Sequence, residues 1–401
     1  MAKTNVYLES KPRYEILDGL RGVAALMVVI FHCFETYVPM FGTQIVNHGY
    51  LAVDFFFVLS GFVIGYAYDD RWDRMTTWGY FKRRLTRLHP MLIAGTIIGA
   101  SLFFFSGSAF PKTQEVEGWK FALCLVMGLF LIPCGPKLDI RGWNEMNSFN
   151  GPAWTLFFEY IGNILYAFVL RRLPKVVLAI LCACCAFFTL DLTLGWDVFG
   201  FFPEGPHYTV IGGWSLDPAQ IYVGFSRLLY PLLCGLLISR ILPSRRTAEN
   251  PSGSPIRIGG GFWWCALALV VLFSIPCIGG LKPGVPDGIY QSVCILLCFP
   301  LIVLTGAGSV TKTAFSTKAC KFLGDLSFPL YITHYPIMYM QMSWVADHEN
   351  APVWMHIAVN TGVVIVSVML AYGLFKCYDL PVREWLKEHW LKRPTSRASA
   401  H

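Results

Sequence analysis

The sequence predicts an all-α, polytopic helical membrane protein with about ten transmembrane helices and both termini in the cytoplasm. Charged residues make up only 14% of the 401 residues, whereas soluble domains carry about a quarter. Hydrophobic residues make up 55% of the chain, and its mean hydropathy is +0.51. Apolar runs of about 17–20 residues recur along the sequence, and about 20 apolar residues cross a bilayer core. One hydrophobic unit therefore accounts for nearly the whole chain.

Eleven apolar runs are candidates for these helices. The first contains Arg21 and His32 and lacks a small-residue cleavage site, so we expect it to remain as a span and not to act as a signal peptide. The run at 121–133 is short for a span, which favours an interfacial or re-entrant segment or one part of a broken pair. Pro90 is expected to mark the start of the helix that follows it. The runs are 16–36, 50–68, 91–110, 121–133, 153–170, 176–192, 219–240, 262–280, 289–306, 328–346 and 354–376.

Basic residues cluster beside these runs, and this pattern predicts the topology. Placing the clusters in the cytoplasm satisfies the positive-inside rule, so the net charge of +7 does not require a nucleic-acid partner. Loops such as 134–152 and 193–218 then lie outside. We expect a cytoplasmic N-terminal segment at 1–14, a transmembrane domain at 15–378 and a basic cytoplasmic tail at 379–401, which lies on an anionic leaflet.

The first run, EILDGLRGVAALMVVIFHCFET, carries three ionisable residues on one predicted helix face. At about 100° per residue, Arg21 and His32 differ by only about 20° and are separated by roughly 16 Å along the axis. Asp18 and Arg21 are spaced i,i+3 and can neutralise each other. Histidine is suited to proton transfer near neutral pH. His32 is therefore a candidate base, and a structural histidine bonded to a neighbouring helix is the alternative.

Further polar residues within apolar surroundings need partners, because ionisable groups are costly in a bilayer. Asp54 could orient His32, pair with Arg21, or make only a helix–helix hydrogen bond. Arg84 and Arg87 share one helix face and are suited to bidentate phosphate binding, although topology and lipid headgroups also explain them.

Two later segments add a buried acid and a second histidine. Glu159 in FNGPAWTLFFEYIGN needs a partner or a proton, and Arg227 is a candidate partner. Trp154, nearby, is alternatively an interfacial aromatic residue. The segment LGDLSFPLYITHYPIMY contains Tyr331 and His334. His334 is either a functional residue or a histidine that only stabilises the fold.

The 13 cysteines lie mostly inside apolar runs. Cys182 and Cys185 have a C-x-x-C spacing inside one apolar run, but no second such pair is present in the sequence to complete a zinc site. We therefore predict neither a disulfide framework nor a metal site.

Five stretches, taken together, resemble the acyltransferase type 3 family of integral-membrane carbohydrate O-acyltransferases. They occur in the family's order and run, with weaker matches, from about residue 15 to 385. The resemblance implies transfer of an acyl group, commonly acetyl, from cytoplasmic acetyl-CoA or another acyl-CoA to a hydroxyl of an extracytoplasmic or lipid-linked carbohydrate. It also implies that the protein is located in the cell inner (plasma) membrane and that the reaction requires no metal ion. The stretches are LDGLRGVAALMVVIFH, GYLAVDFFFVLSGFVIG, FKRRLTRLHP, PAWTLFFEY and LGDLSFPLYITHYP.

The resemblance also implies roles for individual residues. His32 would be catalytic with Arg21 as its partner, and the phosphates of the acyl donor would dock on Arg84 and Arg87. The donor's arm would pass Arg21 toward His32, which acts as a general base or forms an acyl-histidine. The expected catalytic residues are His32, Arg21, Glu159 and Asp54, with Glu159 or Asp54 orienting the His32 ring. The residues expected to bind the acyl donor are Arg84, Arg87 and Arg21. Those expected to bind the substrate are Trp154, Tyr331 and His334.

The expected partners are a carbohydrate or glycolipid acceptor and membrane lipids, with no nucleic acid. Some family members carry an additional extracytoplasmic hydrolase-like domain that passes the acyl group onward. This chain ends soon after its last apolar run, so we expect acceptor transfer by the membrane domain or by a separate extracytoplasmic partner. The competing hypotheses are a transporter or flippase of a lipid-linked saccharide without acyl-transfer chemistry, and a sensor or scaffold.

Overall fold

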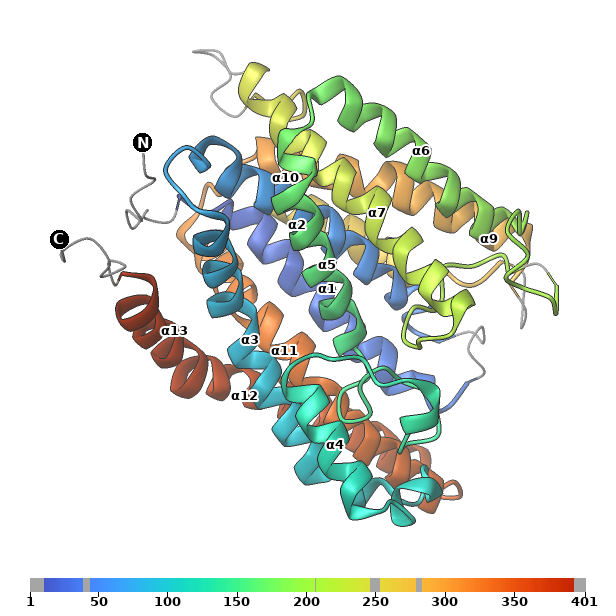
Figure 1. The fold of residues 1–401 in the computed structure, drawn as a ribbon. Helices are drawn as coiled ribbons and strands as arrows, with labels where there is room; N and C mark the ends of the chain where they lie inside the picture. The colour runs from blue at the N-terminus through green and yellow to red at the C-terminus, as the bar shows by residue number, and fades with distance from the viewer. Residues whose placement is uncertain (1–10, 39–43, 206, 246–252, 279–282, 393–401) are drawn as a thin grey trace.

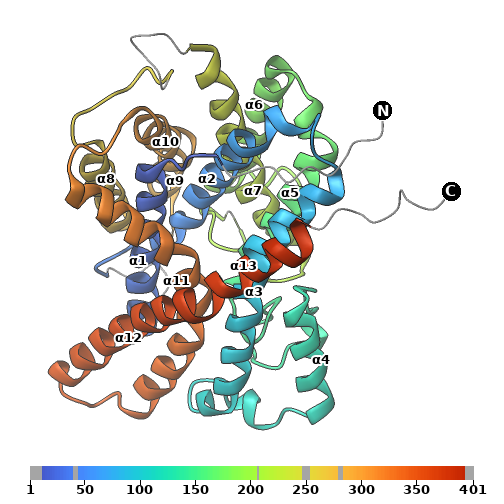
Figure 2. The same cartoon turned by 90° about the vertical axis from the view of Figure 1, so that its left-hand side faces the viewer.

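The computed structural model describes residues 11–38, 44–205, 207–245, 253–278 and 283–392 (Figure 1). Within these ranges the chain is helical and contains no strand. The longer helices pack as one bundle, in which α1 contacts α2, α8, α10, α11 and α12 (Figures 1 and 2). The helices are α1 (Glu15–Glu35), α2 (Ala52–Tyr68), α3 (Thr77–Leu102), α4 (Gly118–Leu129), α5 (Ala153–Phe168), α6 (Lys175–Leu194), α7 (Pro218–Ile241), α8 (Gly261–Ser274), α9 (Val285–Val293), α10 (Phe299–Gly308), α11 (Ala314–Asp347), α12 (Val353–Leu374) and α13 (Leu380–Leu386).

Eight helical stretches in the described part of the chain are long and apolar enough to cross a membrane. They confirm the predicted all-α, polytopic membrane fold. The shorter α8 and the 34-residue α11 pack against α1 beside them. The total of ten crossings and the side on which the termini lie remain predictions. The eight stretches are Glu15–Glu35, Gly49–Arg71, Thr77–Ser106, Ala153–Arg172, Lys175–Leu194, Pro218–Ile241, Val285–Gly308 and Val353–Leu391.

The short fourth run forms α4, a helix of 12 residues that lies beside α3. At about 1.5 Å per residue it is roughly 18 Å long, well short of a bilayer core of about 30 Å. A Cβ atom on Gly128 would lie 2.9 Å from Thr96 of α3, so the two helices approach closely there. The length of α4 supports its interpretation as a segment that does not cross the membrane alone.

The expected helix start at Pro90 is wrong. Helix α3 begins at Thr77, where the side chain of Thr76 accepts a hydrogen bond of 3.0 Å from the Gly79 N–H, and Pro90 lies inside the helix. Proline is tolerated within membrane helices because neighbouring groups can satisfy the backbone that it leaves unpaired. Arg84 and Arg87, which were expected on one helix face, therefore lie in the same continuous helix as the residues after Pro90.

Small residues bring the central helices into close contact. A Cβ atom on Gly22 of α1 would lie 2.2 Å from the Leu323 carbonyl oxygen of α11. A Cβ atom on Gly61 of α2 or on Gly235 of α7 would likewise lie only 2.0 or 1.9 Å from the backbone of the facing helix. Glycine at such positions permits backbones to approach, which is typical of membrane helix packing. The contact between α1 and α11 places His32 beside His334.

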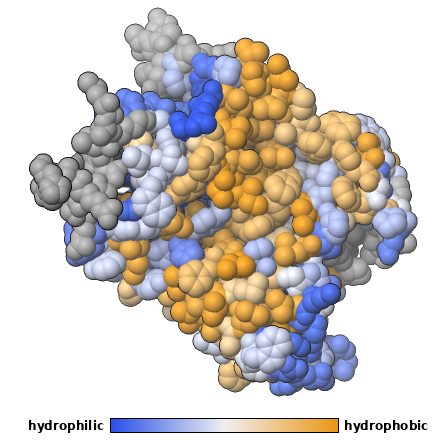
Figure 3. Space-filling model, viewed as in Figure 1, coloured by the Kyte–Doolittle hydropathy of each residue, from blue (hydrophilic) through white to orange (hydrophobic). Residues whose placement is uncertain are grey.

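The outer surface is consistent with a lipid environment. A broad hydrophobic area covers the middle of the face shown in Figure 3, with hydrophilic residues at its margins. The last helix runs almost without interruption from Val353 to Leu391 through π-helical turns, and α13 lies against α3 (Figure 2). The helix therefore crosses the expected boundary at residue 378. Residues 1–10 of the expected N-terminal segment and 393–401 of the expected tail lie outside the described residues.

Candidate active site

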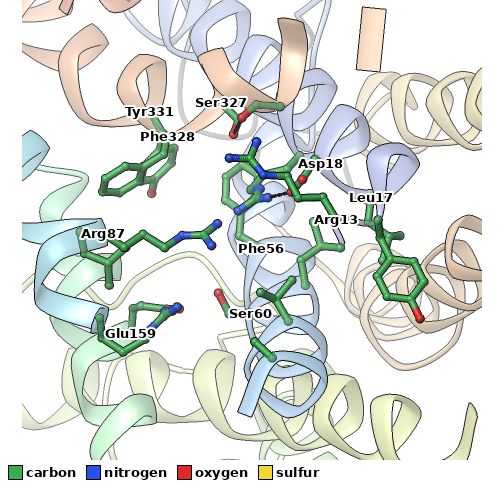
Figure 4. Close-up of a pocket in the computed structure, with 18 of the residues that line it drawn as sticks. Arg13, Leu17, Asp18, Phe56, Ser60, Arg87, Glu159, Ser327, Phe328 and Tyr331 are labelled. Atoms are coloured by element: carbon green, nitrogen blue, oxygen red, sulfur yellow. Dashed lines mark hydrogen bonds and ion pairs between the residues drawn. The ribbon is translucent and has the colours of Figure 1, made fainter. Parts of the chain in front are cut away.

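A cavity of about 440 Å³ lies among α1, α2, α3, α5 and α11 (Figure 4). Its lining combines apolar side chains with eight basic and three acidic ones. This excess of positive charge within low-dielectric walls favours a polyanionic ligand. The basic residues are Lys11, Arg13, Arg21, Arg71, Arg83, Arg84, Arg87 and Arg383, and the acidic residues are Asp18, Glu159 and Asp325.

Arg84 and Glu159 form a buried ion pair across the cavity wall. Arg84 Nη2 donates to Glu159 Oε1 at 2.6 Å, and the two residues are only 5% and 8% exposed. The expected pairing of Glu159 with Arg227 is therefore wrong, because α3 and not α7 brings an arginine to this carboxylate. The charge of Arg84 is largely balanced by its partner, which weakens its suitability as a phosphate ligand.

Arg87 is in a different position, although it lies one helical turn further along α3. Its guanidinium has no hydrogen bond or salt bridge to any other described residue, and its side chain reaches across the cavity (Figure 4). Arg21 is paired with Asp18, as the i,i+3 spacing predicts. Arg383, from α13, is likewise held by Asp379 at 2.5 Å. Arg87 is thus well suited to receive an anionic group of a ligand.

The carboxylate that contacts His32 is Glu35. The ring nitrogen Nδ1 lies 2.7 Å from Glu35 Oε2. The expected orientation of His32 by Asp54 or Glu159 is wrong, because both acids are occupied by arginines. With Nδ1–H donating to the carboxylate, Nε2 keeps its lone pair and is available as a base. The i,i+3 spacing of His32 and Glu35 is the sequence signal for this contact.

Asp54 and Trp154 belong to a second buried arginine network. Arg227 Nη2 donates to Asp54 Oδ2 at 2.7 Å and to the Tyr50 carbonyl oxygen at 2.6 Å. The Arg227 guanidinium also lies 5.3 Å from the centre of the Trp154 ring. Trp154 is only 7% exposed, so it is an interior residue and not part of a lipid-facing aromatic belt. This network fixes α2 to α7 and leaves neither residue in contact with His32.

Residues of α11 line the end of the cavity nearest to His32, which we call its inner end. Tyr331 lines the cavity, and its hydroxyl accepts a hydrogen bond of 3.0 Å from Thr155. His334 lies beyond it, with ring centres 5.9 Å from Tyr331 and 5.5 Å from His32. His32 is not among the residues that line the cavity. Arg87 and Tyr331 thus line the cavity, the His334 ring contacts Tyr331, and His32 stacks on His334.

A buried cluster from the loop at 130–152 packs near the same site, and sequence reasoning did not identify it. Glu145 accepts a hydrogen bond of 2.7 Å from the Tyr339 hydroxyl, and the Arg141 guanidinium lies 3.5 Å from the Tyr339 ring centre. Tyr339 packs edge-on against Tyr335, which in turn packs edge-on against His32. Burial raises the pKa of Glu145 to about 7, while Arg141 opposes this shift. An acid and an arginine spaced i,i+4 in a loop were the available signal.

A family model described as an acyltransferase domain matches residues 14–376. The chain belongs to the acyltransferase type 3 family. The enzyme is thus a multi-pass membrane acyltransferase, as its motifs imply. The described residues contain no group of three or more histidine, cysteine or acidic side chains that could hold a metal ion.

The chain is similar to several known proteins over different parts of its length. It is 36% identical over 163 residues to protein 2 in the picA locus of Rhizobium radiobacter, covering 39% of this chain and 81% of that protein. It is 24% identical over 400 residues to the putative peptidoglycan O-acetyltransferase YrhL of Bacillus subtilis. It is 23% identical over 403 residues to the peptidoglycan O-acetyltransferase OatA of Listeria monocytogenes. These two matches cover 92% and 96% of this chain but only 54% and 58% of the relatives.

Proposed function

We propose that this acyltransferase moves an acetyl group from cytoplasmic acetyl-CoA to a hydroxyl of an extracytoplasmic or lipid-linked carbohydrate in the plasma membrane. The observation that carries this proposal is a strongly basic cavity whose inner end lies next to a pair of histidines, one of them held by a carboxylate. Two relatives named as peptidoglycan O-acetyltransferases support acetyl as the acyl group and a glycan as the acceptor.

The donor is held mainly by Arg87. Coenzyme A carries phosphates that form strong charge-assisted hydrogen bonds with an arginine fork. Arg84 contributes less, because Glu159 already balances its charge at 2.6 Å. The pantetheine arm then extends from the cavity past Arg21 and Tyr331 toward His32. Arg21 keeps its expected role in binding the donor, because it lies beside this path and Asp18 fixes the orientation of its side chain.

His32 is the catalytic base in this proposal, and Glu35 positions it. Nε2 of His32 takes the proton of the acceptor hydroxyl while the hydroxyl oxygen attacks the thioester carbonyl carbon. The new C–O bond forms, the C–S bond breaks, and the same proton returns to the leaving thiolate to give free coenzyme A. Attack by His32 itself, with an acyl-histidine as intermediate, remains the alternative route. Asp54 and Glu159 hold the surrounding helices and do not touch the reacting atoms.

The experiment uses the full chain in proteoliposomes with acetyl-CoA labelled in the acetyl group. Peptidoglycan fragments and lipid-linked oligosaccharides serve as acceptors, and mass spectrometry identifies any acetyl ester. We expect labelled ester from the wild type and none from His32→Ala. His348→Ala is the matched control, because this exposed histidine stacks on Trp344 away from the site and should leave activity unchanged.

A transporter of lipid-linked saccharides is the competing function. Its buried charges would have to form a path, but the arginines that meet Asp54 and Glu159 hold these acids in closed pairs. Movement of a labelled lipid-linked saccharide across the bilayer, with no acetyl ester formed on any acceptor, would overturn the proposed transferase function.

A further inference from the structure

His334 is a fully buried histidine whose two ring nitrogens are in very different surroundings. Its exposed fraction is 0%. Nδ1 lies 3.1 Å from the Leu330 carbonyl oxygen and 2.9 Å from that of Tyr331. A carbonyl oxygen only accepts hydrogen bonds, so Nδ1 must carry the hydrogen. The backbone of α11 therefore fixes the tautomer, and Nε2 of the neutral ring is left as an acceptor.

Nothing in the described part of the chain donates to that acceptor. Nε2 of His334 is buried and has no hydrogen-bond partner there. A buried polar atom without a partner costs about 1–3 kcal/mol, so such atoms usually have a reason to be retained. The surroundings do not provide an internal donor, because the neighbouring rings of His32, Tyr331 and Tyr335 make only ring contacts with it. The acceptor therefore has no partner within the described part of the chain.

The position of this atom points to the acyl-transfer site. The His334 ring lies between Tyr331, which lines the cavity, and His32, with which it is stacked at 29° between ring planes. This ring is therefore in contact both with a residue of the cavity wall and with His32. The same region must admit the acceptor hydroxyl, because the proton of that hydroxyl is removed by His32.

We propose that His334 is a substrate-positioning residue whose Nε2 accepts a hydrogen bond from an O–H or N–H group of a substrate bound next to His32. The shared chemistry is a neutral hydrogen-bond donor. It is supplied either by a second hydroxyl of the acceptor saccharide, next to the one that His32 deprotonates, or by an amide of the donor's pantetheine arm. This inference rests on the proposed function, since both groups belong to the substrates of that reaction.

The contrast with His32 shows why His334 positions the substrate and does not act as the base. A carboxylate on Nδ1 stabilises the imidazolium that His32 forms when it takes a proton, whereas the carbonyl groups on Nδ1 of His334 carry no net charge. A second positive ring stacked on a protonated His32 would also be unfavourable. The two histidines therefore have separate tasks, one in proton transfer and one in holding a neutral donor.

The test compares two amide substitutions of His334 in the full chain. The amide of His334→Asn reaches the position of Nδ1 and keeps a donor for the backbone carbonyls, but it provides no acceptor at the position of Nε2. The longer His334→Gln places its amide oxygen near Nε2 and can replace the acceptor. His207→Asn is the control, because this histidine contacts the Ile211 carbonyl in a loop apart from the site.

We expect His334→Asn to lower kcat/KM by about 10- to 100-fold, which corresponds to the loss of one buried hydrogen bond. His334→Gln should recover most of this loss, and both variants should unfold at the wild-type temperature. A raised KM for the saccharide assigns the donor group to a second hydroxyl of the saccharide, and a raised KM for acetyl-CoA assigns it to the pantetheine arm. The pH profile of kcat/KM should keep its shape in both variants, because His32 is unchanged.

Two results would overturn the inference while leaving the proposed function intact. One is equal loss in both variants together with a lower unfolding temperature, which would mean that His334 only supports the fold. The other is wild-type activity in both variants, which would mean that no substrate group binds Nε2. Failure of the wild type to acetylate any saccharide instead overturns the proposed function itself, so the two failures are distinguishable.

Discussion

The buried pair of Arg84 and Glu159 gives a prediction that separates a structural role from a chemical one. The two groups are 2.6 Å apart and almost fully buried. Removing one partner of a buried ion pair costs about 3–5 kcal/mol, because the other charge is left uncompensated. We therefore expect Arg84→Met and Glu159→Gln each to lower the free energy of unfolding by this amount. The double variant should be more stable than either single one, because no lone charge remains.

The assay is unfolding of the detergent-solubilised enzyme followed by tryptophan fluorescence, together with kinetics at varied acetyl-CoA. Glu159→Gln should lower the KM for acetyl-CoA, because it releases the positive charge of Arg84 to the cavity. A Glu159→Gln enzyme that unfolds like the wild type but transfers no acetyl group would refute this reasoning, and would place Glu159 in the chemical step. Equal stability of the double variant and the worse single variant would also contradict it.

Three further predictions concern Arg87, Glu35 and Glu145. Arg87→Ala should raise the KM for acetyl-CoA about tenfold or more through loss of a charge-assisted hydrogen bond, and should leave the KM for acetyl-pantetheine, which lacks the nucleotide phosphates, unchanged; equal effects on both donors would contradict phosphate binding. Glu35→Gln should lower kcat about 10- to 100-fold by analogy with other residues that orient a histidine, with the KM for acetyl-CoA unchanged, and wild-type kcat would exclude the positioning role. Burial raises the pKa of the Glu145 carboxyl from 4.5 to about 7, so the protonated carboxyl stabilises the folded state. The stability that it contributes is lost as the pH rises from about 4.5 to 7. Glu145→Gln should therefore gain stability over the wild type across that interval, by up to about 3 kcal/mol, and parallel unfolding temperatures from pH 4.5 to 8 would show that the carboxyl stays ionised.

Local relationships within one helix could be predicted from the sequence. The period of an α-helix places Asp18, Arg21 and His32 on one face, and the structure confirms the contact between Asp18 and Arg21. The apolar runs predicted the membrane helices because a bilayer imposes both length and composition. The i,i+3 spacing of His32 and Glu35 also predicts their contact. Asp54 or Glu159 was instead expected to orient His32.

Contacts between helices could not be predicted in this way. The sequence shows that Asp54 and Glu159 each need a partner, but it offers several arginines and no distance between helices. The observed partners, Arg227 and Arg84, lie 173 and 75 residues away in the chain, and packing alone selects them. The loop cluster around Glu145 was missed for a related reason, because an irregular loop has no period from which side-chain directions follow.

The separation between Asp54 and Arg227 has a consequence for biosynthesis. The ribosome completes α2 long before it reaches α7, so the nascent chain must carry a carboxylate without its counter-charge, at a cost of up to about 3 kcal/mol in lipid. The ion pair between Asp54 and Arg227 can form only after α7 has entered the membrane. We therefore expect the two halves of this bundle to assemble after α2 has been inserted, and not helix by helix as each one is synthesised.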